Sequence, residues 1–198
     1  MKKTILLCLL IACVSCIPLP HKSHQGEGES KEYTRAFKEF GFSITAPCEL
    51  KQDPPVNELW NDEYYKTVII DGVLENPDNP ENMTLYLIVA REAQKAFEDL
   101  SEAEQNELME KIKTADFDES PGSGYYDVKK ILFLDKYPGY VGARNYADLC
   151  ARSMTFNKGN YIISLTVLDD NPNCDQKVLN QRFNKFTKSF KAIEAVRP

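Results

Sequence analysis

Two cysteines near the start of the chain, Cys13 and Cys16, have the Cys-x-x-Cys spacing that elsewhere forms a redox pair or contributes zinc ligands. They lie, however, in an uncharged apolar stretch, ILLCLLIACVSCIPLP at residues 5–20, which follows a start with two lysines. This stretch is too short to span a bilayer as a helix and has the length of the apolar part of a signal peptide. We therefore predict an export leader here rather than a redox or zinc site.

The end of this leader resembles a bacterial lipoprotein signal, in which a small residue precedes the cysteine that receives the lipid. Cys13 matches the pattern better but leaves a leader of only twelve residues, whereas Cys16 gives a more usual length and has Ser15 before it. If Cys16 is the lipidated residue, Cys13 occupies a position of the signal where an aliphatic residue is expected. We favour Cys16 as the lipidated residue. The resemblance implies a protein of the bacterial cell envelope, anchored to the membrane only by lipid and facing the periplasm.

The segment after Cys16 combines proline, glycine, serine and charged residues without an apolar period, which is typical of a flexible tether. The predicted organisation is a signal peptide at residues 1–16, a tether at 17–32 and a single domain at 33–198. Both histidines of the chain, His21 and His24, fall in the tether, where few other ligands surround them. We predict no metal site there.

With both histidines in the tether, the domain has no imidazole, which excludes Ser-His-Asp and Cys-His catalysis. The domain also contains no glycine-rich phosphate loop. The net charge of the whole chain is −6, which argues against a nucleic-acid partner. We therefore predict that the protein is not an enzyme, has no cofactor and binds no nucleic acid.

Carboxylates are the remaining groups that could do chemistry. Pairs such as Asp169-Asp170, or Asp116 with Asp118, could serve a hydrolase, but 30 acidic residues make such pairs inevitable. One stretch, DDNPNCD, places oxygen-bearing side chains at alternate positions, as in a calcium loop: Asp169, Asn171, Asn173 and Asp175. Cys174 replaces the glycine of such a loop, and Asn180 stands where its closing glutamate belongs. The alternative is a turn before a helix that Asn173 or Asp175 caps.

Aromatic residues gather beside loop signals, and large side chains with a polar tip are suited to protein recognition. We single them out as a candidate partner surface: Trp60, Tyr64, Tyr65, Tyr125, Tyr126, Tyr137 and Tyr140. The alternative is that they cover the edges of the core.

The apolar patterns predict an α+β domain. Strands are expected at 40–46, 67–74, 83–91, 129–134, 140–146, 151–156 and 161–168. Ser101 and Glu104 form a capping box that begins a helix. A second, amphipathic helix closes the chain, with its apolar side chains at steps of three and four: Leu179, Phe183, Phe186, Phe190 and Ile193. We expect an antiparallel sheet of about six to seven strands with the helices packed on it.

Two segments resemble the PsbP-like domain family: GFSITAP at residues 41–47, and FNKFTKSFK at 183–191 after a curled meander of strands. The resemblance covers roughly residues 33–194 and consists of element order with a few landmark residues. The family includes the extrinsic subunit of photosystem II, a nuclear-transport protein that binds the GTPase Ran, and many bacterial envelope proteins. Its members share protein binding rather than catalysis. The resemblance implies that the domain binds or supports another envelope protein; the alternative is a surface binder of a small ligand or calcium.

An exported domain lies in an oxidising compartment, where disulfides persist. Cys48, Cys150 and Cys174 are the cysteines outside the leader. Pairing across the turn Lys158-Gly159-Asn160 brings Cys150 opposite the end of the following strand, close to Cys174. We therefore predict a Cys150–Cys174 disulfide with Cys48 left alone; the alternative is three buried free thiols.

Overall fold

The computed structural model describes residues 31–75, 83–119, 124–146, 149–171 and 174–195. Residues 31–198 form one compact unit. The predicted signal peptide with Cys13 and Cys16, and the tether with His21 and His24, lie outside the described residues, apart from the last two tether residues. No helix within the described ranges is long and apolar enough to cross a membrane.

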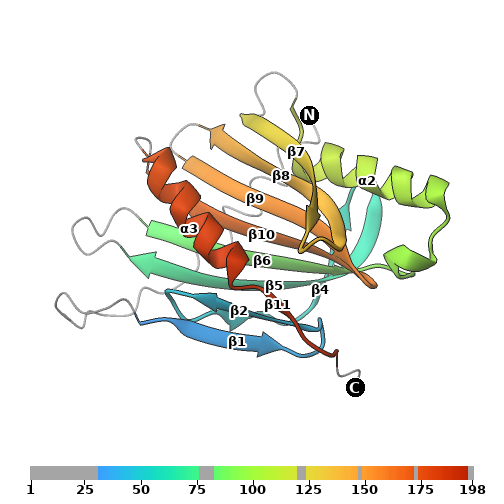
Figure 1. Cartoon of the computed structure of the whole chain (residues 1–198), viewed down its shortest axis with the longest axis horizontal. Helices are drawn as coiled ribbons and strands as arrows, with labels where there is room; N and C mark the ends of the chain where they lie inside the picture. The colour runs from blue at the N-terminus through green and yellow to red at the C-terminus, as the bar shows by residue number, and fades with distance from the viewer. Residues whose placement is uncertain (1–30, 76–82, 120–123, 147–148, 172–173, 196–198) are drawn as a thin grey trace. The chain divides into compact units, whose positions relative to one another are not determined.

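Strands and helices make an antiparallel α+β domain (Figure 1). Among the described residues, the large sheet has eight strands in the order β3-β5-β6-β10-β9-β8-β7, with β4 paired to β5. Its strands are β3 (Lys51–Gln52), β4 (Val56–Trp60), β5 (Glu63–Glu75), β6 (Met83–Glu92), β7 (Tyr125–Phe133), β8 (Tyr137–Tyr146), β9 (Leu149–Lys158) and β10 (Tyr161–Asp169). A small sheet has the order β1-β2-β11, with β1 (Tyr33–Phe37), β2 (Phe42–Ala46) and β11 (Lys191–Ala192). The helical segments are η1 (Phe97–Asp99), α2 (Glu102–Asp116) and α3 (Gln176–Lys188).

The antiparallel α+β class is as predicted, but the predicted count of six to seven strands in one sheet is too small. The strand expected at 40–46 is β2, which belongs to the separate small sheet. The additional strands, β1, β3, β4 and β11, have largely exposed side chains. Because a strand with little burial carries no apolar alternation, the sequence pattern does not mark these four.

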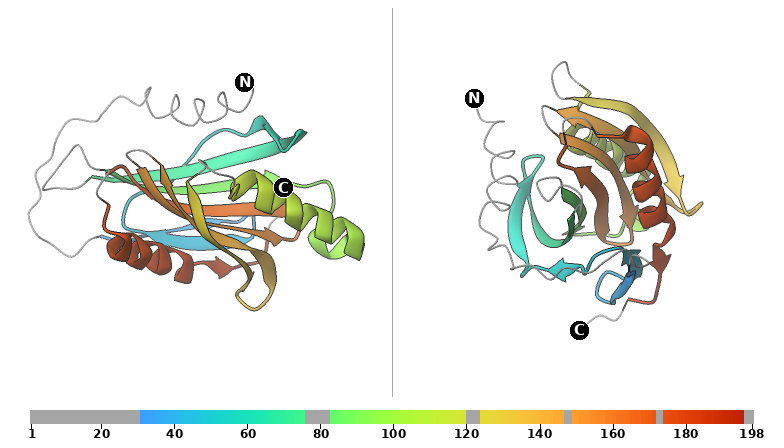
Figure 2. Two further views of the ribbon diagram at one scale, coloured as in Figure 1. Left: turned by 90° about the horizontal axis from the view of Figure 1, so that it is seen from above. Right: turned by 90° about the vertical axis from the view of Figure 1, so that its left-hand side faces the viewer.

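The large sheet buries side chains on both faces. Successive residues of a strand point to opposite faces, and Ile162 and Ile163 of β10 belong to two different apolar clusters. The cluster of Ile163 also contains Leu179 and Phe183 of α3 and Phe42 of β2. The cluster of Ile162 contains Met109 and Ile112 of α2. The two helices therefore cover opposite faces of a strongly curled sheet, which Figure 2 shows from two further sides.

The side chain of the preceding residue caps the N-terminus of both α2 and α3. The Ser101 side chain accepts a hydrogen bond from the Glu104 backbone N–H, and the Glu104 carboxylate accepts one from the Ser101 backbone N–H, which is the predicted capping box. The Asp175 carboxylate begins α3 by accepting from the backbone N–H groups of Lys177 and Val178. The closing helix ends at Lys188, so Phe190 and Ile193 of the predicted apolar face follow the helix rather than belong to it.

Candidate functional site

The aromatic residues singled out from the sequence do not form one exposed surface. Trp60 is only 3% exposed, and Tyr137 and Tyr140 are also buried, so for these three the alternative of core packing holds. Tyr65 and Tyr125 are half-buried. Only Tyr64, on β5, and Tyr126, on β7, are exposed. The physical reason is that a large aromatic side chain beside a loop contributes most to the stability of the fold when it is buried at the edge of the apolar core.

Four of these aromatic residues meet beneath α2. Trp60 and Tyr140 belong to the apolar cluster under the helix, and Tyr65 and Tyr125 pack against it. The Trp60 and Tyr65 rings meet edge to face, with 5.3 Å between their centroids. Tyr137 belongs instead to the cluster on the other face of the sheet. The first four therefore attach α2 to the sheet rather than present a surface to a partner.

A buried polar network lies beside this cluster, at the end of α2. The Asp116 carboxylate accepts hydrogen bonds from Trp60 Nε1 at 2.9 Å, Thr155 Oγ1 at 2.8 Å and Ser164 Oγ at 3.2 Å. The Arg91 guanidinium lies 3.9 Å from the same carboxylate and 5.1 Å from the centre of the Trp60 ring. The three donors come from β4, β9 and β10 and the ion-pair partner from β6, so Asp116 joins the helix to four strands.

Arg91 also pairs with Glu58, at 3.4 Å between Nε and Oε2, and its side chain is only 9% exposed. Each charge of the network thus has an opposite charge within 4 Å, although among the described residues Arg91 Nε and Glu58 Oε2 make no hydrogen bond. Because the carboxylate of Asp116 is held by these donors, we infer that it stabilises the fold and is not the reactive half of an Asp116–Asp118 pair.

Most of the exposed large apolar side chains lie on two hairpins instead. One set is Val56, Leu59, Tyr64 and Val73 on β4–β5, the other is Tyr126, Leu132 and Leu134 on β7–β8, and Val178 lies on α3. Leu132 is 56% exposed even though it lies within a strand. Contiguous exposed apolar groups mark interaction sites more often than isolated ones do.

A groove of about 410 Å³ lies beside Leu132, between the η1–α2 segment and strands β7 to β9. We call it the α2–β7 groove. Residues that line it include Phe97, Met109, Lys130, Leu132, Tyr137 and Asn157. Apolar side chains thus form much of its wall, while Lys130 and Lys136 supply positive charge on the hairpin side and Glu98 supplies negative charge on the helix side.

A second hollow of about 500 Å³ lies at the other end of the large sheet, and Phe40, Val68 and Tyr161 line it. Its charged residues Lys66 and Glu92 already pair with each other at 3.5 Å. None of the exposed apolar side chains named above borders it. The α2–β7 groove therefore combines more of the features of a recognition surface.

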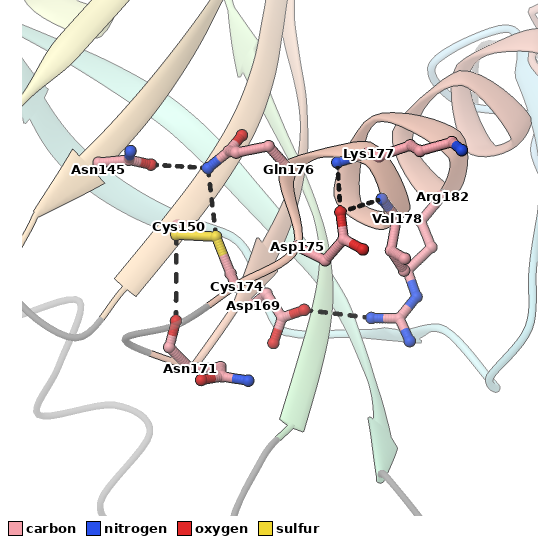
Figure 3. Close-up of a disulfide and its surroundings, with 10 residues drawn as sticks. All are labelled: Asn145, Cys150, Asp169, Asn171, Cys174, Asp175, Gln176, Lys177, Val178 and Arg182. Atoms are coloured by element: carbon pink, nitrogen blue, oxygen red, sulfur yellow. Dashed lines mark hydrogen bonds and ion pairs between the residues drawn. A yellow bond between two sulfur atoms is a disulfide. The ribbon is translucent and has the colours of Figure 1, made fainter.

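Two carboxylates of the stretch with calcium-like spacing make contacts to α3 (Figure 3). The Asp169 carboxylate accepts a hydrogen bond from Arg182 Nη1 at 3.2 Å, and Asp175 caps α3. Burial raises the pKa of Asp169, and the Arg182 charge partly opposes this effect. Asn173 lies outside the described residues. Within the described ranges, no group of three or more His, Cys, Asp or Glu side chains converges as metal ligands would.

The same region holds a disulfide between Cys150 and Cys174, the pair expected from the strand register. Cys150 lies opposite Asp169 in the β9–β10 pair, and the Cα atoms of the two cysteines are 6.3 Å apart. The bond joins β9 to the residue before the N-cap of α3. Cys48 is free and buried, and its burial raises the pKa of its thiol to about 11.

No family model and no curated protein matches the chain. Among solved structures, the chain is similar to cyanobacterial PsbP (CyanoP) from Synechocystis sp. PCC 6803. The similarity covers 86% of this chain and 98% of that protein, with 12% sequence identity and a TM-score of 0.47. PsbP is the family that the segments at 41–47 and 183–191 resemble. At this level of similarity, no partner and no site residue is carried over from it.

Proposed function

We propose that the chain is a lipid-anchored protein of the bacterial envelope, that its domain binds another protein, and that it has no catalytic site of its own. The observation that carries the proposed binding is the exposure of Leu132, which lines the α2–β7 groove, and of Leu134 on the same hairpin. A strand side chain that is 56% exposed gains by burial against a partner, at about 25 cal/mol per Å² of apolar area.

The chemistry of the domain supports binding rather than catalysis. Residues 25–198 contain no histidine. Of the acidic residues considered for catalysis, Asp116 accepts three hydrogen bonds and lies 3.9 Å from Arg91, and Asp169 accepts a hydrogen bond from Arg182. Cys48, the free thiol among the described residues, is buried with a raised pKa, which keeps it in the unreactive protonated form at neutral pH.

The first prediction concerns the anchor. We expect protein isolated from its native membrane to begin at Cys16 and to carry a diacylglyceryl group on that thiol, because more than one acyl chain is needed for stable anchoring. Mass spectrometry of the N-terminal peptide measures this directly. A lipid on Cys13 would change only which cysteine is the lipidated residue. An unlipidated N-terminus beyond residue 16 would refute the anchor.

The second prediction concerns partner capture. After cross-linking in the native envelope, the full chain should retain a protein that the Leu132→Glu variant retains about tenfold less well, because the charge must be desolvated in an apolar contact. Val178→Glu is the matched control, since Val178 is an exposed apolar residue on α3. Equal retention by all three proteins would show that the β7–β8 hairpin is not the binding surface.

A further inference from the structure

We propose that the partner binds as an extended acidic and apolar segment, which adds a strand to the free edge of β7. This inference rests on the proposed function and specifies the chemistry of its partner. The proposal concerns residues 129–133 of β7, which we call the β7 edge.

The backbone of β7 provides the first argument. Among the described strands, β7 is the last of the large sheet and pairs with β8 on one side only (Figure 1). A bulge interrupts the pairing between Tyr126 and Lys129, but from Lys129 to Phe133 the register with β8 is regular. An antiparallel strand directs half of its N–H and C=O groups away from its one neighbour. The β7 edge therefore provides a regular run of backbone groups to an incoming strand.

The side chains of β7 provide the second argument. Lys130 and Leu132 are two residues apart, so both point to the face of the sheet that α2 covers, and both line the α2–β7 groove. A strand added at the β7 edge would place its own alternate side chains about 5 Å from these two. An apolar side chain there would cover Leu132 and extend the apolar wall of the groove.

Charge provides the third argument. Within the described ranges, neither Lys130 nor Lys136 lies in ion-pair distance of a carboxylate, whereas Lys129 pairs with Asp127. Burial, and next the Lys136 charge, lower the pKa of Lys158, while the Glu98 charge on the helix side of the groove opposes this effect. The positive charge of the groove therefore lies on its hairpin side, at Lys130 and Lys136. The whole chain has a net charge of −6, which makes this positive spot a local exception. Charge complementarity therefore favours a segment with acidic side chains.

The same charges argue against a second copy of this chain as the occupant. Two β7 strands paired edge to edge would bring their lysines together, and like charges on adjacent strands destabilise the pair. Lysines and a bulge are devices by which an edge strand avoids self-association. Here they leave the edge available to a segment of opposite charge.

The test uses the full chain in detergent and the peptide acetyl-Glu-Val-Glu-Val-Glu-Val-amide as the probe, with hydrogen–deuterium exchange as the readout. At saturating peptide, we expect the alternate amides of residues 129–133 that face away from β8 to exchange about tenfold more slowly, because new backbone hydrogen bonds protect them. Amides of β4, a strand at the other end of the sheet, should be unaffected. Protection of β4 instead of β7, or of neither strand, would overturn the proposal.

A charge exchange provides the control. The double variant Lys130→Glu, Lys136→Glu should bind the acidic peptide about tenfold more weakly and should bind the peptide with lysine in place of glutamate more tightly than the wild type does. An unchanged preference would contradict the charge argument. If Leu132→Glu lowers partner capture about tenfold but the acidic peptide does not slow exchange in β7, the proposal of strand addition is wrong while the proposed function stands. If no protein is captured at all, the proposed function fails.

Discussion

Replacing Asp116 with alanine should lower the free energy of unfolding by about 3 kcal/mol, because it leaves the buried Arg91 with one carboxylate fewer. The same change removes the acceptor of Trp60 Nε1, Thr155 Oγ1 and Ser164 Oγ. Urea unfolding measures the effect, and the fluorescence of Trp60 reports on this region because it is the single tryptophan of the chain. Asp170→Ala is the control: this exposed carboxylate should change the stability by less than about 0.5 kcal/mol.

A second variant removes the charge of Asp116 but only part of its hydrogen bonding. Asp116→Asn retains one oxygen, which can accept from Trp60 Nε1 or from Thr155 Oγ1 but not from both, and it removes the charge that faces Arg91. We expect it to destabilise the protein less than alanine does. If Asp116→Ala lowers the free energy of unfolding by less than about 1 kcal/mol, then Glu58 or water is a sufficient partner for the Arg91 charge. In that case this network does not hold α2 on the sheet.

Loss of the Cys150–Cys174 bond should lower the free energy of unfolding by about 3 kcal/mol, from the chain entropy of a loop of 24 residues. The double variant Cys150→Ser, Cys174→Ser, compared with the wild type in urea without reductant, measures this. Reductant should destabilise the wild type by a similar amount and leave the double variant unchanged. Cys48 should not exchange into the bond, because its thiol has a pKa of about 11 and stays protonated at neutral pH.

The pairing itself is checked by peptide mapping without reduction. The expected product is a cross-linked pair of peptides that contain Cys150 and Cys174. A peptide linked through Cys48, or free thiols at all three positions in protein purified from the envelope, would contradict the pairing.

Much of the domain follows from local signals in the sequence. The capping box at Ser101 marks the start of α2, and the turn at Gly159-Asn160 sets the register that places Cys150 opposite Asp169. The small sheet does not follow from such signals. Its strand β11 has only two residues and pairs with β2, which lies far away in sequence, and no periodicity can reveal a pairing of that kind.

The candidate site was less accessible from the sequence, because exposure depends on which strands become neighbours. Trp60 and Tyr137 are of residue types that are common in recognition surfaces, but both are buried. Conversely, Leu132 reads as a core residue in the run KKILFL, and it is exposed because β7 is the last strand. One signal for the polar network was present: Arg91 ends a nearly continuous apolar run, and a charge in a strand covered on both faces requires a buried partner.

Photo-cross-linking at a single residue tests most directly whether the domain binds a protein through the face beside the α2–β7 groove. A photoreactive amino acid is placed at Leu132 of the full chain, and in a second protein at Val178, and both are irradiated in the native envelope. We expect a discrete adduct of higher mass from position 132 and none from position 178. An adduct from position 178 alone, equal adducts from both positions, or no adduct from position 132 would contradict the proposed binding surface.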